Sequence, residues 1–234
     1  MTLRRIGLIV PSSNTTMERE VPKLVRKLGP PDVEYSFHGA RVPMKHVVKE
    51  ELVAMNARAM TAMRDLMDAP MDAVAYACLV AIMAMGKGHH RAAAEELQAV
   101  ARETGRHTAA LTSAGALVRQ LRENGVKKVA LVMPYADALA RTVAEYIEAE
   151  GMQVLDYVNL SVTDNAEVGC ITGERVLDAA RRLKLKGADH LVLSCCVQMP
   201  SADILEKAEI LTGVPVTSAA LCTAKEILRE LEAA

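Results

Sequence analysis

The sequence contains no tryptophan, one phenylalanine and five tyrosines. Proteins that stack nucleic-acid bases or a flavin ring use aromatic side chains for the purpose, so this composition argues against both kinds of site. Positive and negative charges nearly cancel, at 28 Lys and Arg against 29 Asp and Glu. This balance provides neither the basic surface of a nucleic-acid-binding protein nor a polybasic membrane patch. We therefore expect no nucleic-acid and no membrane partner.

Long apolar runs are also missing. No run approaches the roughly 20 residues that a membrane-spanning helix needs. Arg4 and Arg5 precede only six apolar or small residues before Ser12, which is too few for a secretory signal. These absences predict a cytoplasmic protein. Its 234 residues are enough for one large domain or two small ones with a substantial core.

The cysteines form no C-x-x-C motif and are odd in number. The five are Cys78, Cys170, Cys195, Cys196 and Cys222. Their number and wide spacing argue against a disulfide framework, which a chain of this size does not need. The adjacent pairs Cys195-Cys196 and His89-His90 lack the ligand spacing of zinc sites. We expect reduced thiols and no metal.

Two of the cysteine sites follow short apolar runs. Residues 72–77 lead to Cys78, and residues 189–194 lead to Cys195 and Cys196. In open α/β sheets, ligands bind beyond the carboxyl ends of the strands, so a thiol in this position is placed for chemistry. The number of residues from Asp72 to Cys78 equals the number from Asp189 to Cys195. Spacing alone therefore leaves open which cysteine of the second run is the counterpart of Cys78.

The first strand and the turn after it predict an anion site. Residues 5–11 are a continuous apolar run, as expected of a parallel strand covered on both faces. A polar turn, residues 12–16, precedes an amphipathic helix, and Thr15 and Glu18 have the spacing of a capping box. A strand, a polar turn and a helix N-terminus together favour anion binding. Asn14 is the side chain we expect to reach into that site.

The pattern of strands and helices is repeated in the second part of the chain. Residues 125–134 predict a strand that ends in proline, as the first strand does at Pro11. Alternating strands and helices imply parallel sheets with right-handed crossovers. We predict an α/β fold of two pseudo-symmetric flavodoxin-like halves, residues 1–111 and 112–216. A C-terminal helix, residues 217–234, is expected to pack back on the first half, with the active site in the cleft between the halves.

Two loops are candidates for closing over that cleft. They are residues 39–48 and residues 85–90. The histidines in or near them, His38, His89 and His90, are expected to be loop and surface residues rather than catalytic bases.

Several short motifs together carry a resemblance that runs from the first strand to the last helix. They are residues 11–18 (PSSNTTME), 77–81 (ACLVA), Pro134-Tyr135, Asn165 and 194–200 (SCCVQMP). These motifs resemble those of the maleate cis-trans isomerases in the aspartate/glutamate racemase superfamily. In that superfamily each half offers one cysteine to the cleft. The second typically starts a C-x-x-x-P segment, which selects Cys196 over Cys195.

The resemblance implies a function and a set of site residues. The implied reaction is cofactor-independent isomerisation of maleate to fumarate, with Cys78 as the nucleophile and Cys196 as the acid. The residues implied to bind the substrate are Asn14, Leu79, Val80, Tyr135, Asn165 and Val197. No metal is implied. The expected partners are the small dicarboxylate itself and further copies of the chain, in a homodimer or larger homo-oligomer.

Thiol chemistry is suited to this reaction. Addition of a thiolate to one alkene carbon makes the central bond single, so that it can rotate before elimination restores the alkene. The reaction needs a nucleophile and a proton source. An ordinary thiol has a pKa of about 8.5, and a dianionic substrate raises it further. Helix N-termini after Cys78, Cys196 and Pro11 are expected to offset that effect.

Three other functions compete with the isomerase. In an amino-acid racemase of the same fold, acting on aspartate, glutamate or hydantoins, the two thiols would remove and return an α-proton. An arylmalonate-type decarboxylase keeps a single cleft cysteine, and the presence of Cys78 argues against it. The third alternative is a non-catalytic protein that binds small anions.

Overall fold

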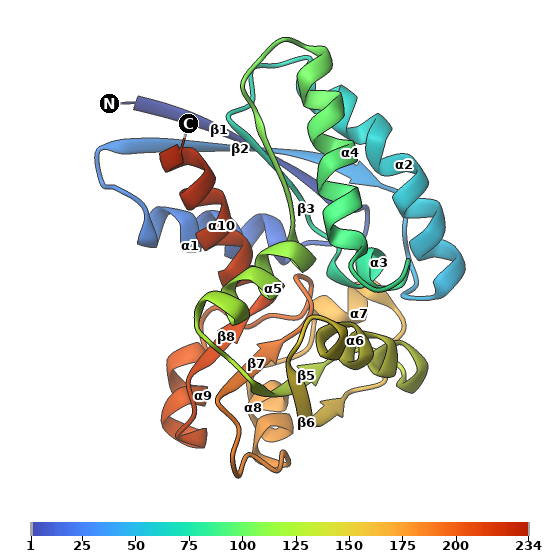
Figure 1. Ribbon diagram of the computed structural model, residues 1–234, viewed down its shortest axis with the longest axis vertical. Coiled ribbons are helices and arrows are strands. Elements are labelled where there is room, and N and C mark those ends of the chain that lie inside the picture. Colours follow the sequence, from blue (N-terminus) through green and yellow to red (C-terminus); the bar gives the residue numbers. More distant parts are fainter. Residues whose placement is uncertain (1, 234) are drawn as a thin grey trace.

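A computed structural model describes residues 2–233 of the chain. It contains two four-stranded parallel sheets, ordered β2-β1-β3-β4 and β6-β5-β7-β8. The equivalent strand order of the two sheets confirms the predicted α/β fold with two pseudo-symmetric halves. Figure 1 shows one sheet above the other, with helices on both sides of each.

The first sheet and its helices come from the N-terminal part of the chain. In chain order they are β1 (Thr2–Pro11), α1 (Met17–Leu28), β2 (Val33–Val42), α2 (Lys49–Met67), β3 (Ala73–Tyr76), α3 (Leu79–Met83), α4 (His89–Glu103) and β4 (Ala109–Thr112). Helices α2 and α4 pack together on one side of the sheet (Figure 1). The apolar run predicted as the first strand is the centre of this half, because Ile6 to Val10 lie between helices with almost no exposure.

The second sheet follows after one connecting helix, α5 (Ser113–Glu123). Its elements are β5 (Lys128–Met133), α6 (Asp137–Ala149), β6 (Gln153–Asn159), α7 (Asn165–Gly169), α8 (Gly173–Arg181), β7 (His190–Ser194), α9 (Leu205–Thr212) and β8 (Val216–Ser218). The last helix, α10 (Ala219–Ala233), packs against α1 and α5 (Figure 1). Among residues 2–233, no helix is both long and apolar enough to cross a bilayer. The division into domains at residue 111 stays a prediction.

The two halves repeat a specific set of hydrogen bonds. The N–H of Asp72 donates to the carbonyl of Arg5, and the N–H of Asp189 donates to that of Lys128, both at 2.8 Å. Each aspartate carboxylate also accepts a backbone N–H from the opposite segment, at 2.7 Å from Arg5 and from Lys128. These bonds fix the register at which β3 enters the first sheet and β7 enters the second.

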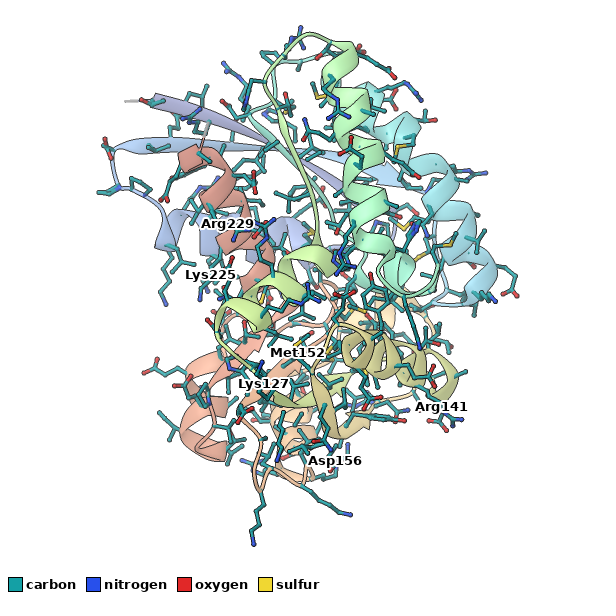
Figure 2. The ribbon with its side chains drawn as sticks, in the orientation of Figure 1. Lys127, Arg141, Met152, Asp156, Lys225 and Arg229 are labelled. Carbon is teal, nitrogen blue, oxygen red and sulfur yellow. The ribbon has the colours of Figure 1, made fainter. Side chains whose placement is uncertain are left out.

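Ion pairs tie helices of different parts of the chain together. Figure 2 labels Arg229 on α10, which donates to Glu123 of α5 at 2.7 Å. Glu150, just after α6, lies at 3.0 Å from Arg91 of α4 and at 2.8 Å from Arg122 of α5. Burial raises the pKa of Glu150, but the hydrogen bond from Arg91 and the nearby positive charges outweigh it, so that the pKa lies below its ordinary value.

His90, one of the histidines predicted to lie in a surface loop, takes part in the contact between α4 and α6. Helix α4 begins at His89, and His90 is buried rather than exposed. Its Nδ1 lies 2.6 Å from the Tyr146 hydroxyl of α6. The expectation of a surface histidine was wrong, because α6 of the second half covers the first turn of α4. His38 is on the surface and contacts Ser36.

We predict that Glu150→Gln lowers the free energy of unfolding by about 2 kcal/mol at pH 7, since a charged acceptor for two arginines is lost. A depressed carboxyl pKa contributes stability above the unfolded-state pKa, and this contribution is lost as the pH falls through the folded-state pKa. The difference between wild type and variant in urea unfolding should therefore shrink as the pH is lowered toward 4. Glu148→Gln, at an exposed position on the same helix, is the control. An equal loss in both variants would contradict the assignment.

Candidate active site

One pocket between the two halves contains all eight residues that the sequence motifs assigned to a site. It is lined by Pro11, Asn14, Met44, Val47, Ala77, Cys78, Leu79, Val80, Tyr135, Asn165, Cys196, Val197 and Gln198. The first half contributes the ends of β1 and β3, and the second half contributes the ends of β5 and β7. The carboxyl ends of parallel strands meet here, as expected for a ligand site in this fold class.

Cys78 sits between β3 and α3. The strand ends at Tyr76, and Cys78 is the residue just before the first turn of α3. Burial raises the pKa of its thiol to about 12, and the Ala81 N–H, which points at the sulfur, lowers it only in part. The nearby Cys196 raises it further. Cys78 is therefore a protonated thiol at neutral pH.

The backbone identifies the counterpart of Cys78 in the second half. After β3, the N–H of Ala77 donates to the carbonyl of Ile9 at 2.8 Å. After β7, the N–H that makes the equivalent bond, to Val132 at 3.1 Å, belongs to Cys195. Cys195 is thus the equivalent of Ala77, and the next residue, Cys196, is the equivalent of Cys78.

A register shift explains why residue counting favoured the wrong cysteine. The pairing of β7 with β8 is irregular between Val192 and Ser194. Such an irregularity places one extra residue in the strand and redirects the side chains that follow. Cys196 consequently lines the pocket, whereas the fully buried Cys195 does not. Of the remaining cysteines, Cys170 is exposed and Cys222 is buried.

The surroundings of Cys196 differ from those expected. Residues 195–204, all described by the structure, contain no helix, so the helix N-terminus predicted after Cys196 is absent. Instead the Gln198 N–H points at the Cys196 sulfur at 3.4 Å. Burial raises the pKa of Cys196, and the N–H groups of Gln198 and Met199 oppose that rise. Hydrogen bonds from a tight loop replace the helix dipole.

Tyr135 is fully buried beneath Cys196. Its hydroxyl donates to the carbonyl of Cys195 at 2.7 Å. Because a phenol has one hydrogen, it can donate to a bound carboxylate only by turning away from that carbonyl. Burial raises its pKa well above the ordinary value, so it is a donor and not a base at neutral pH.

Asn14 stabilises the turn before α1 in a way that the capping-box prediction missed. Its Oδ1 accepts the N–H groups of Thr16 at 3.1 Å and Met17 at 3.0 Å. The cap is thus an Asx turn from Asn14, and α1 begins at Met17 without a side-chain bond from Thr15. The Nδ2 of Asn14 is buried, lines the pocket, and has no partner among the described residues. A buried donor without an acceptor is costly, and a ligand oxygen would satisfy it.

Asn165 begins the short helix α7 on the other side of the pocket. Its Nδ2 donates to the Ser13 hydroxyl at 2.8 Å, and its backbone N–H donates to Lys45. Asp164 caps the helix. The polar turn predicted here is therefore held against the first half of the molecule.

One of the two candidate loops reaches the pocket. Met44 and Val47, from the 39–48 segment, line it, and the N–H of Val47 donates to Thr163 of the second half at 2.8 Å. The 85–90 segment does not line it. Met44, Val47 and Gln198 are pocket residues that the sequence motifs did not single out as substrate-binding. Met44 is 30 residues from Asn14 in the chain, and no local sequence pattern indicates that a loop residue so distant lines the same pocket.

The pocket is uncharged. Among the residues described by the structure, none that lines it is Asp, Glu, Lys, Arg or His. Within residues 2–233 there is also no group of three or more His, Cys, Asp or Glu side chains that could hold a metal ion. The polar groups available to a ligand are amides, one phenol, two thiols and backbone N–H groups.

Comparison with known proteins agrees with the geometry. A family model described as arylmalonate decarboxylase matches residues 6–234. Maleate isomerases from Alcaligenes faecalis and Nocardia farcinica are 46% and 48% identical, each over 99% of this chain and 92% of the relative. The chain belongs to the arylmalonate decarboxylase family, among the maleate isomerases. This membership confirms the resemblance that the motifs carry.

Two solved structures of maleate isomerases superimpose closely. One, from Pseudomonas putida S16 with maleate, is 41% identical with a TM-score of 0.95, over 99% of this chain and 93% of that one. The other, from N. farcinica, carries a cysteine-to-serine substitution and a covalently bound succinylcysteine intermediate. It is 46% identical with a TM-score of 0.95, over 98% of this chain and 93% of that one. Arylmalonate decarboxylase itself, at 19% identity and a TM-score of 0.74, shares the fold.

We predict that iodoacetamide at pH 8 labels Cys170 quickly and Cys78 very slowly. A thiol with a pKa of about 12 is ionised to about one part in 10⁴ at pH 8, and alkylation of Cys78 should rise about tenfold per pH unit up to pH 10. Peptide mass spectrometry of wild type and of Cys170→Ser measures the rates. Labelling of Cys78 at a pH-independent rate would contradict the burial argument.

Proposed function

We propose that this protein isomerises maleate to fumarate by reversible addition of the Cys78 thiolate to the double bond. The observation that carries the proposal is the position of two thiols, from opposite halves, in one uncharged pocket. The succinylcysteine in the N. farcinica relative supports the same chemistry. No step of the reaction needs a cofactor.

The Cys78 thiol gives its proton to water before the first step and takes one back at the end of the cycle. As a thiolate, its sulfur forms a bond to one alkene carbon, and the π electrons move to the neighbouring carbon and its carboxylate. Cys196 donates its proton to that neighbouring carbon, which gives a succinyl adduct on Cys78 and a thiolate at Cys196. The former double bond is now single and rotates. Cys196 then takes a proton from the same carbon, the C–S bond breaks, and fumarate leaves with both thiols restored to their starting states.

Hydrogen-bond donors, rather than opposite charges, would hold the two carboxylates. The first N–H groups of α3, at Leu79 and Val80, have no partner within the helix, and both residues line the pocket. The Nδ2 of Asn14 is a third donor without a partner. On the other side, Val197, Tyr135 and Asn165 supply further candidates. Donors of this kind stabilise charge without having to reorganise during the reaction.

The uncharged pocket favours the isomerase over an amino-acid racemase. Aspartate and glutamate carry an ammonium group, whose burial requires a carboxylate or several acceptors. Within the described residues, the pocket lining offers no carboxylate. A dicarboxylate needs hydrogen-bond donors instead, and these the pocket residues offer. Assembly into a homodimer or larger homo-oligomer stays a prediction.

The first test is covalent trapping. With Cys196→Ser, water has to protonate the adduct carbon and the thiolate that would remove the proton again is absent, so incubation with maleate should leave an adduct on Cys78 with the mass of one maleic acid molecule. Intact mass and peptide mapping detect it. Cys78→Ser should show neither adduct nor fumarate, and Cys195→Ser should retain most of the activity. An adduct on Cys195, or full activity of Cys78→Ser, would refute the assignment.

The second test separates the two functions of Asn14. Asn14→Asp keeps the oxygen that caps α1 but replaces the pocket-facing donor with a negatively charged acceptor. We expect kcat/KM for maleate to fall by about 100-fold or more, with little change in Tm. Asn14→Ala should lose the cap as well, and with it about 1 kcal/mol of stability. If Asn14→Asp keeps wild-type kcat/KM, Asn14 does not bind the substrate.

A further inference from the structure

Gln198 is a buried side chain that makes four hydrogen bonds to the backbone of two other segments. Its Oε1 accepts the N–H groups of Thr15 at 3.1 Å and Thr16 at 3.2 Å. Its Nε2 donates to the carbonyls of Ser13 at 3.1 Å and Asn165 at 2.8 Å. Both amide donors and both acceptor lone pairs of the side chain are thus used.

These bonds connect the chain segments that contain Asn14 and Asn165, the two asparagines that line the pocket. The Ser13–Thr16 turn belongs to the first half and holds Asn14, whereas Asn165 belongs to the second half. The turn also receives a direct bond from Asn165 to Ser13. Gln198 therefore fixes the position of Asn14 relative to Asn165 across the boundary between the halves.

The backbone of Gln198 also contacts the Cys196 thiol. Its N–H points at the Cys196 sulfur at 3.4 Å and lowers the pKa of that thiol. The side-chain bonds hold the backbone from which this N–H projects. One residue thus links the acid–base thiol to both asparagines.

The packing leaves little freedom for this side chain. A Cβ on Gly169 of α7 would lie 2.6 Å from the Gln198 Nε2. The glycine therefore provides the space that the amide occupies, and a side chain at position 169 would displace the amide.

We propose that Gln198 is a positioning residue for the isomerisation, holding Asn14, Asn165 and Cys196 in one arrangement. The inference rests on the proposed function. It goes beyond that function because Gln198 has no step of its own in the reaction and acts through the groups that it connects.

Gln198→Met tests the role, since methionine has a similar length and makes none of the four bonds. We expect kcat to fall at least tenfold when measured well below the melting temperature. The matched control is Gln98→Met on α4, because Gln98 also bonds through both its amide groups to the backbone, at Thr108 and Ala110 of one segment, but lies away from the pocket. Gln98→Met should lower Tm while kcat stays within threefold of wild type. Equal kcat values in the two variants would overturn the proposal.

Gln198→Glu provides a readout that a purely structural role would not change. The carboxylate can still accept from Thr15 and Thr16, but it repels the carbonyls of Ser13 and Asn165. When protonated it regains one donor. Burial and the two carbonyls raise the pKa of such a carboxyl, so its activity relative to wild type should rise as the pH falls from 8 to 5.5. The deficit of Gln198→Met should not depend on pH. A pH-independent deficit in Gln198→Glu would contradict the positioning role.

Amide hydrogen exchange separates this inference from the proposed function. In Gln198→Met the peptide that contains Thr15 and Thr16 should exchange faster than in wild type, whether or not maleate is a substrate. If wild type fails to isomerise maleate but this exchange accelerates, the reaction is wrong and the connection between the halves stands. If wild type is active and the exchange is unchanged, the connection is wrong.

Discussion

The whole site depends on one constraint, which is that two thiols are buried in a pocket without a charged group. Burial disfavours the thiolate of both Cys78 and Cys196, and the lining offers no arginine or lysine to offset it among the described residues. An uncharged pocket binds a dianion only through oriented donors, and in the proposed function these are the N–H groups at the start of α3, the amide of Asn14 and the loop after β7. The same lining offers no carboxylate to an ammonium group, which favours the proposed dicarboxylate substrate over an amino acid.

The duplicated fold supplies the geometry for this arrangement. Asp72 and Asp189 set the same register in the two sheets, so that each sheet ends with a cysteine at the shared edge. The halves are not identical where the chemistry takes place. Cys78 precedes a helix, whereas Cys196 lies in a loop whose N–H groups point at its sulfur. This difference suits unequal roles, with one thiol adding to carbon and the other transferring a proton.

The sequence predicted the two sheets and the pocket residues because both depend on strong local patterns. Apolar runs ending in Pro11, Cys78 and Cys195-Cys196 mark the buried strands and the edge where they meet. Features that depend on backbone detail could not be predicted. The irregular pairing of β7 moved the thiol by one residue, the cap of α1 came from Asn14 instead of Thr15, and His90 was covered by a helix of the other half. Met44 and the bonds of Gln198 involve contacts between distant segments, which short motifs do not encode.

Stereochemistry offers the most direct test of the two-thiol mechanism. In the proposed mechanism the thiols approach from opposite halves, so that Cys196 delivers a proton to the alkene face opposite the Cys78 sulfur. Elimination to fumarate after rotation then removes the hydrogen that was originally on that carbon, and the delivered one stays. Fumarate formed in D₂O should therefore carry one deuterium on a vinyl carbon, measured by mass spectrometry and proton NMR. Fumarate formed in D₂O without deuterium would contradict a protonated succinyl adduct and the role of Cys196.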